Sequence, residues 1–124
     1  MYKRLKHPLI LEKLTYIING ILFETHNALG RYCREKQYGD FIEKKLIELN
    51  VSYTREFPVP GTGNIVDFLI EDVLILELKA KRFITKADYY QTQRYLHSSN
   101  KMLAILVNFT DLRLKPRRII KTNK

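Results

Sequence analysis

The chain has 124 residues, the length of one ordinary domain, and we expect a single domain over residues 1–124 with one hydrophobic core. Apolar residues make up 45% of the chain, which is typical of a globular protein, and no run of them is long enough for a membrane span. Lysine and arginine number 22 against 13 acidic residues, and the net charge of +9 favours a polyanionic partner such as nucleic acid.

The cysteine and histidine content argues against two common kinds of stabilised domain. Cys33 is the single cysteine, so an internal disulfide is excluded, and the three histidines are too scattered for a zinc site. The basic start of the chain is followed by a segment that Glu12 and Lys13 interrupt, unlike the apolar centre of a signal peptide. We therefore expect a cytoplasmic protein without a structural metal.

The first part of the chain has the apolar spacing of two helices. Apolar residues recur every three to four positions over residues 9–29, which predicts an amphipathic helix that ends at Gly30. Gly20 inside this helix favours close packing or a local bend. A second helix is predicted from an inward-facing stripe formed by Tyr38, Phe41, Ile42, Leu46 and Leu49.

Glu35 lies one turn before this stripe and has two interpretations. An acidic residue at the start of a helix is stabilised by the positive end of the helix dipole. Alternatively, its carboxylate reaches a metal site built on the strands that follow.

The central part of the chain predicts three strands. Residues 51–59 form the first, and residues 65–70 and 73–78 form a hairpin because both runs are rich in branched apolar residues. The two strands of the hairpin meet at Glu71 and Asp72. Their apolar residues point to both sides of the sheet, so helices should cover both faces.

Three charged residues, Asp67, Glu77 and Lys79, lie inside these apolar strands, where a charge without a partner is costly. Side chains alternate along a strand, so Glu77 and Lys79 face the same side. A two-residue turn puts Asp67 opposite Leu76, whereas a three-residue connection or a bulge puts it opposite Glu77. A shared site requires the second register. The alternative is that Asp67 marks a strand end while Glu77 and Lys79 form an ion pair.

The last part of the chain predicts a helix, a buried strand and an edge strand. Thr85 and Asp88 have the spacing of a capping box that opens a helix over residues 86–98, whose tyrosines are expected to pack with their hydroxyls at the surface. Residues 102–109 predict a buried strand and residues 113–120 an edge strand. The order of elements predicts an α/β fold with a mixed central sheet flanked by helices.

Several motifs together match one known group of proteins. The run 32–38, Tyr-Cys-Arg-Glu-Lys-Gln-Tyr, is followed by Val-Asp-Phe at 66–68 and by Leu-Glu-Leu-Lys-Ala at 76–80. These motifs resemble those of the GxxExxY protein family, in the PD-(D/E)XK nuclease superfamily, and the resemblance extends over about residues 10–120. The chain departs from the pattern at Tyr32, where the family has glycine, and at Val66, where the superfamily has proline.

The resemblance implies a restriction-endonuclease-like αβββαβ core and a nuclease that hydrolyses phosphodiester bonds of DNA. Asp67, Glu77 and the carbonyl of Leu78 would hold Mg²⁺ or Mn²⁺, whose preferred ligands are hard oxygens. Lys79 would position the attacking water, Glu35 would complete or orient the metal shell, and Gln91 would support the site from the next helix.

Basic residues cluster at 2–7, 79–82 and 113–124, and this charge suits a nuclease as well as its alternative. The alternative is a non-catalytic module on the same fold that binds nucleic acid or another partner. A third interpretation is a homodimeric accessory protein whose tyrosine-rich helix forms the interface. The presence of all five polar residues of the site favours the nuclease.

Overall fold

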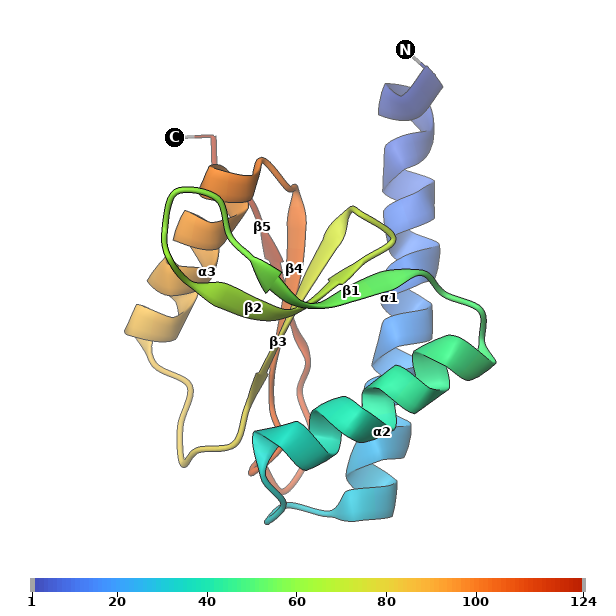
Figure 1. The fold of residues 1–124 in the computed structure, drawn as a ribbon, viewed down its shortest axis with the longest axis vertical. Coiled ribbons are helices and arrows are strands. Elements are labelled where there is room, and N and C mark those ends of the chain that lie inside the picture. Colours follow the sequence, from blue (N-terminus) through green and yellow to red (C-terminus); the bar gives the residue numbers. More distant parts are fainter. Residues whose placement is uncertain (1, 124) are drawn as a thin grey trace.

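The computed structural model describes residues 2–123, with side chains from residue 11 onward, so the side chains of the basic cluster at residues 2–7 lie outside the described part. Within this range, three helices surround a five-stranded mixed sheet (Figure 1). The elements are α1 (Tyr2–Leu29), α2 (Glu35–Glu48), β1 (Tyr53–Pro58), β2 (Ile65–Ile70), β3 (Leu74–Lys79), α3 (Lys86–Ser99), β4 (Leu103–Asn108) and β5 (Arg117–Ile120).

The strands lie side by side in chain order, β1-β2-β3-β4-β5. The first three form an antiparallel meander, β4 runs parallel to β3, and β5 returns antiparallel at the edge. A parallel pair needs a long crossover, and α3 provides it. The α/β class, the mixed sheet and the αβββαβ core are therefore confirmed, with α2 as the first helix of that core.

The helices cover both faces of the sheet, as the apolar character of β2 and β3 predicted. Figure 1 shows α1 and α2 on one side and α3 on the other. The core under α1 and α2 includes Ile18, Leu22, Tyr38, Ile42, Phe68, Leu76 and Val107. The core under α3 includes Ile75, Leu96, Ala104 and Leu106. Alternate residues of β3 and β4 thus serve opposite cores, and β4 is buried along its whole length.

Three details of the predicted helices are different in the structure. Helix α1 begins at Tyr2, earlier than the predicted start at residue 9, because the apolar spacing that predicted the helix does not extend into its more polar first residues. Close packing at Gly20 was wrong, since a Cβ atom there would have no neighbour within 4 Å among the described residues. Leu49 does not join the inward stripe of α2. It is the C-terminal cap of that helix and is 55% exposed.

The connection between β2 and β3 is the three-residue alternative. Phe68 pairs with Leu76, and residues 71–73 form the connection. The same register continued by one residue places Asp67 opposite Glu77. A two-residue turn would have placed them on opposite faces of the sheet, because neighbouring side chains along a strand alternate.

Two residues of this connection have left-handed backbone conformations, with φ of 52° at Glu71 and 60° at Asp72. Such a conformation costs a residue other than glycine about 1–2 kcal/mol, less for Asp. The Glu71 carboxylate accepts hydrogen bonds from the backbone N–H and hydroxyl of Ser52, at 2.8 and 3.2 Å. Asp72 forms an ion pair with Lys101 at 3.3 Å. These contacts help to hold the conformation that sets the register.

Replacing Asp72 tests whether this backbone conformation limits stability. Asp72→Val and Asp72→Gly both remove the ion pair with Lys101, but only valine is penalised in the left-handed region. We expect the valine variant to be less stable than the glycine variant by about 1–2 kcal/mol in chemical denaturation. Equal stabilities of the two variants would show that the turn does not need this conformation.

Candidate active site

Asp67 and Glu77 lie where the regular pairing of β2 with β3 stops, one residue beyond Phe68 and Leu76. The backbone N–H of Asp67 donates to Oε1 of Glu77 at 3.0 Å. The backbone N–H of Leu78 donates to Oδ2 of Asp67 at 2.7 Å. Each carboxyl group therefore accepts a hydrogen bond from the opposite strand, and the two are held side by side.

The pairing of β1 with β2 is also interrupted at Asp67. The strands pair on both sides of this position, but Glu56 and Asp67 do not pair with each other. Glu56 has a left-handed φ of 57°, which turns its backbone away from the regular ladder. Left-handed residues other than glycine often occur next to functional sites, and here the strained residue borders the acidic pair.

Burial has a strong effect on the protonation of the acidic pair. Glu77 is 6% exposed. Burial, and then the charge of Asp67, raise the pKa of Glu77 to about 8. Burial also raises the pKa of Asp67, although the N–H of Leu78 and a hydrogen bond with Glu77 oppose this. Burial and the neighbouring carboxyl group therefore both favour the protonated form of Glu77.

Lys79 and Glu35 complete the group of charges that the sequence predicted. Lys79 is half-buried, and its positive charge lowers the pKa of Asp67, Glu77 and Glu35 alike. Glu35 is the first residue of α2. Burial, followed by the charge of Asp67, raises its pKa, and the backbone N–H of Ala80 opposes the rise. Glu35 thus opens α2, where the helix dipole favours an acid, and it interacts electrostatically with Asp67. A role of its carboxylate at a metal stays a prediction.

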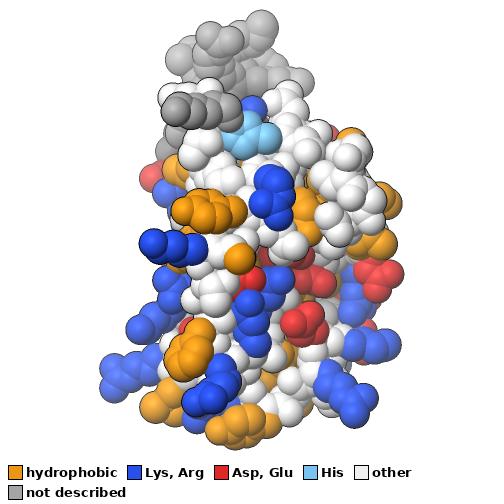
Figure 2. All heavy atoms as spheres, turned by 90° about the vertical axis from the view of Figure 1, so that its left-hand side faces the viewer, with side chains coloured by type: hydrophobic (Ala, Val, Ile, Leu, Met, Phe, Trp, Pro, Cys, Tyr) orange, Lys and Arg blue, Asp and Glu red, His pale blue; other side chains and the backbone are white. Residues whose placement is uncertain are grey.

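A cleft of about 500 Å³ opens between α2 and the strands that carry these residues. It is lined by Glu35, Lys36, Gly39, Arg55, Glu56, Asp67, Phe68 and Leu78. Figure 2 shows acidic side chains gathered near the middle of one face, with lysine and arginine side chains on both sides of them. The positive charge around this acidic centre is a distribution that favours polyanions.

The helix on the other side of the sheet contributes Tyr95. Gln91 is half-buried on α3 and is not among the residues that line the cleft. Tyr95, one turn later, is 4% exposed and packs in the core under α3. Burial, and then the charges of Glu77 and Asp67, raise the pKa of Tyr95, which shows that its phenol is close to the acidic pair. Its place one turn after Gln91, on a helix rich in tyrosine, was the sequence signal for this position.

The acidic pair provides donors that suit a divalent metal. Among the described residues, no group of three or more histidine, cysteine, aspartate or glutamate side chains forms a metal site. The predicted set of Asp67, Glu77 and the carbonyl of Leu78 contains two such side chains. Their oxygens are hard ligands, the two carboxyl groups lie side by side, and burial raises the pKa of both, so a cation bound between them would favour their charged forms. The residues present therefore fit Mg²⁺ or Mn²⁺, with water or substrate as the remaining ligands.

Glu77→Gln tests the charge deficit of the metal-free site. A glutamate in the unfolded chain has a pKa near 4.5, whereas folded Glu77 has a pKa of about 8. Between these values the folded state binds more protons, so the wild type loses stability as pH rises. Glutamine does not ionise. We therefore expect the free energy of unfolding of the Glu77→Gln variant, relative to that of wild type, to increase by a few kcal/mol, at most about 5, from pH 4 to pH 8.5. Chemical denaturation in EDTA measures this difference, and parallel stability curves would contradict it.

Comparison with known proteins adds independent information on this site. A family model described as the PD-(D/E)XK nuclease superfamily matches residues 12–119. No curated protein and no solved structure matches the chain. No helix in the described residues has the length and apolar character needed to cross a membrane. This family model covers most of the chain, including Glu35, Asp67, Glu77 and Lys79. The chain therefore belongs to the PD-(D/E)XK nuclease superfamily.

Proposed function

We propose that the chain is a divalent-metal-dependent nuclease that hydrolyses phosphodiester bonds of DNA. The observation that carries the proposal is the contact between Asp67 and Glu77, which reaches across two strands and is surrounded by the charges of Lys79 and Glu35. The superfamily is one of nucleases, and its members usually use divalent metals. The net charge of +9 supports a nucleic acid as the substrate.

In this proposal Asp67, Glu77 and the carbonyl of Leu78 hold the metal. A bound Mg²⁺ or Mn²⁺ supplies a Lewis acid that lowers the pKa of water and neutralises charge on the phosphate. Glu77 has to release its proton before its carboxylate becomes a ligand, because its pKa is about 8. Metal binding therefore becomes tighter as pH rises toward 8.

The remaining residues act on water and phosphate. The ammonium group of Lys79 donates hydrogen bonds that position the attacking water, and its charge offsets the negative charge that develops on the phosphate. Glu35 orients ligands from the opposite wall of the cleft. Tyr95 keeps bulk water away from the buried side of the acidic pair, and Gln91 supports the site one turn before it on α3.

We also propose that the chain belongs with the GxxExxY proteins inside the superfamily. Tyr38 supports this, because its hydroxyl donates to the carbonyl of Gly30 at 2.6 Å and accepts from the N–H of Cys33 at 3.2 Å. The tyrosine of the signature thus holds the turn that leads into Glu35. Tyr32, which replaces the glycine of the signature, does not have a positive φ, so its side chain causes no strain in this turn.

One observation favours the alternative of a non-catalytic binding module. The acidic pair accepts hydrogen bonds from two backbone N–H groups, so the protein itself holds both carboxyl groups in place. The same basic surface would then bind nucleic acid without cleaving it. Metal titration combined with a cleavage assay separates the two functions.

The proposed roles predict different results for the acids and the lysine. Asp67→Ala and Glu77→Ala should abolish both Mn²⁺ binding in calorimetry and DNA cleavage, because water replaces a charged ligand poorly. Lys79→Ala should keep Mn²⁺ binding, since it removes a neighbouring positive charge, but should lower the cleavage rate about 100-fold or more. Wild-type protein that binds no metal and cleaves neither DNA nor RNA would make the binding module the better account.

A further inference from the structure

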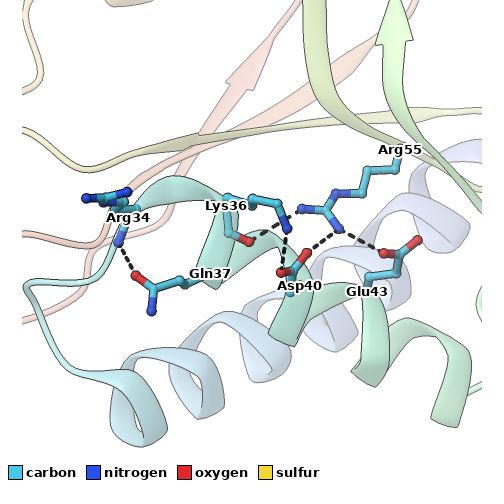
Figure 3. Close-up of polar contacts among 6 residues, drawn as sticks. All are labelled: Arg34, Lys36, Gln37, Asp40, Glu43 and Arg55. Atoms are coloured by element: carbon cyan, nitrogen blue, oxygen red, sulfur yellow. Dashed lines mark hydrogen bonds and ion pairs between the residues drawn. The ribbon is translucent and has the colours of Figure 1, made fainter.

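Arg55 links β1 to α2 across one end of the cleft. Its Nη1 donates to Oδ1 of Asp40 at 2.7 Å and to Oε1 of Glu43 at 2.8 Å (Figure 3). Its Nη2 donates to the backbone carbonyl of Lys36 at 3.5 Å. The Nζ of Lys36 also pairs with Oδ2 of Asp40, at 3.1 Å. One arginine from the sheet thus holds the N-terminal half of α2.

The charges show that this arginine is an anchor. An arginine that lines a nuclease cleft could instead bind a substrate phosphate. Here, however, Asp40 and Glu43 already neutralise the guanidinium, and the Arg55 side chain is only 22% exposed. The guanidinium also lies over the ring of Phe68, 5.6 Å from its centre, next to Asp67 in β2. Its contacts therefore fix the distance between α2 and the strand of the acidic pair.

Gly39 provides the space that this arrangement needs. A Cβ atom at position 39 would lie 2.5 Å from Nη2 of Arg55 and 3.2 Å from its Cζ. Glycine inside a helix costs about 1 kcal/mol relative to alanine. The φ of Gly39 is not in the positive range, so the backbone conformation does not require glycine. Glycine at position 39 is instead explained by the Arg55 guanidinium, which occupies the space that a Cβ atom would need.

The helix that Arg55 holds begins at Glu35, whose carboxyl group lines the cleft with Asp67. We infer that Arg55 is a positioning residue, which sets Glu35 against the acidic pair through its contacts with Asp40 and Glu43. The inference rests on the proposed function, in which these acids surround a divalent metal. Loss of the anchor should therefore weaken metal binding through Glu35, although Arg55 does not itself bind the metal.

Gly39→Ala tests this inference without removing a charged group. The added methyl group displaces the guanidinium of Arg55, and the better helix propensity of alanine offsets part of the lost contacts, so the fold should stay intact with a thermal midpoint close to that of wild type. Mn²⁺ affinity, measured by calorimetry, should nevertheless fall about tenfold, as it does when groups that orient ligands are removed. Gly20→Ala is the matched control, since its methyl group meets open space and should leave Mn²⁺ affinity unchanged.

A second pair of variants shows whether the effect passes through Glu35. Glu35→Gln alone should weaken Mn²⁺ binding, and adding Gly39→Ala to it should cause no further loss. Arg55→Met should reproduce the effect of Gly39→Ala. If wild type binds Mn²⁺ and Gly39→Ala binds it equally well, or if the losses in the double variant add, the role of Arg55 is overturned and the proposed function stands. Wild type that binds no Mn²⁺ overturns both.

Discussion

The site depends on the register between β2 and β3. Three connecting residues, 71–73, place Asp67 opposite Glu77, and a connection one residue shorter would turn one of the two acids to the other face. The register is held by left-handed residues whose carboxylates contact Ser52 and Lys101. A short turn four residues after Asp67 thus decides whether the two acids meet, and the proposed metal chemistry requires that they do.

The acidic pair destabilises the part of the sheet that carries it. The carboxyl groups of Asp67 and Glu77 lie side by side between the strands. At this point the N–H groups of Asp67 and Leu78 donate to these carboxyl groups, in place of the regular backbone hydrogen bonds between β2 and β3. The raised pKa of Glu77 reports the remaining cost. A buried charge without full compensation lowers stability, but it also prepares a site for a cation. The surrounding cores of β3 and β4 are apolar and supply the stability that this arrangement uses.

The sequence was enough to predict the order of elements, because apolar periodicity and the capping residues Thr85 and Asp88 are local signals. It could not choose the register, since Glu71 and Asp72 fit a two-residue turn as well as a longer connection. The sequence also left the role of Glu35 open, since the cleft that this residue lines with Asp67 is formed by elements far apart in the chain.

Other parts of the site depend on contacts between residues far apart in the chain. Arg55 joins β1 to residues of α2 that no local sequence pattern connects with it. The glycine at position 39 is explained only by the position of the Arg55 guanidinium in the structure. Tyr95 was expected to be a packing residue, but its neighbours came only from the structure, where it packs in the core under α3 and the charges of Glu77 and Asp67 raise its pKa. Such features follow from tertiary packing, which propensity and spacing do not report.

Anomalous diffraction from crystals grown with Mn²⁺ is the most direct test of the central claim. The account predicts one strong peak between the carboxyl groups of Asp67 and Glu77, within coordination distance of both and of the Leu78 carbonyl, about 2.0–2.3 Å. It also predicts that Glu77 gives up its hydrogen bond with the Asp67 carboxylate. A saturated crystal with no metal at this pair, and with both carboxyl groups still bonded to each other, would contradict it.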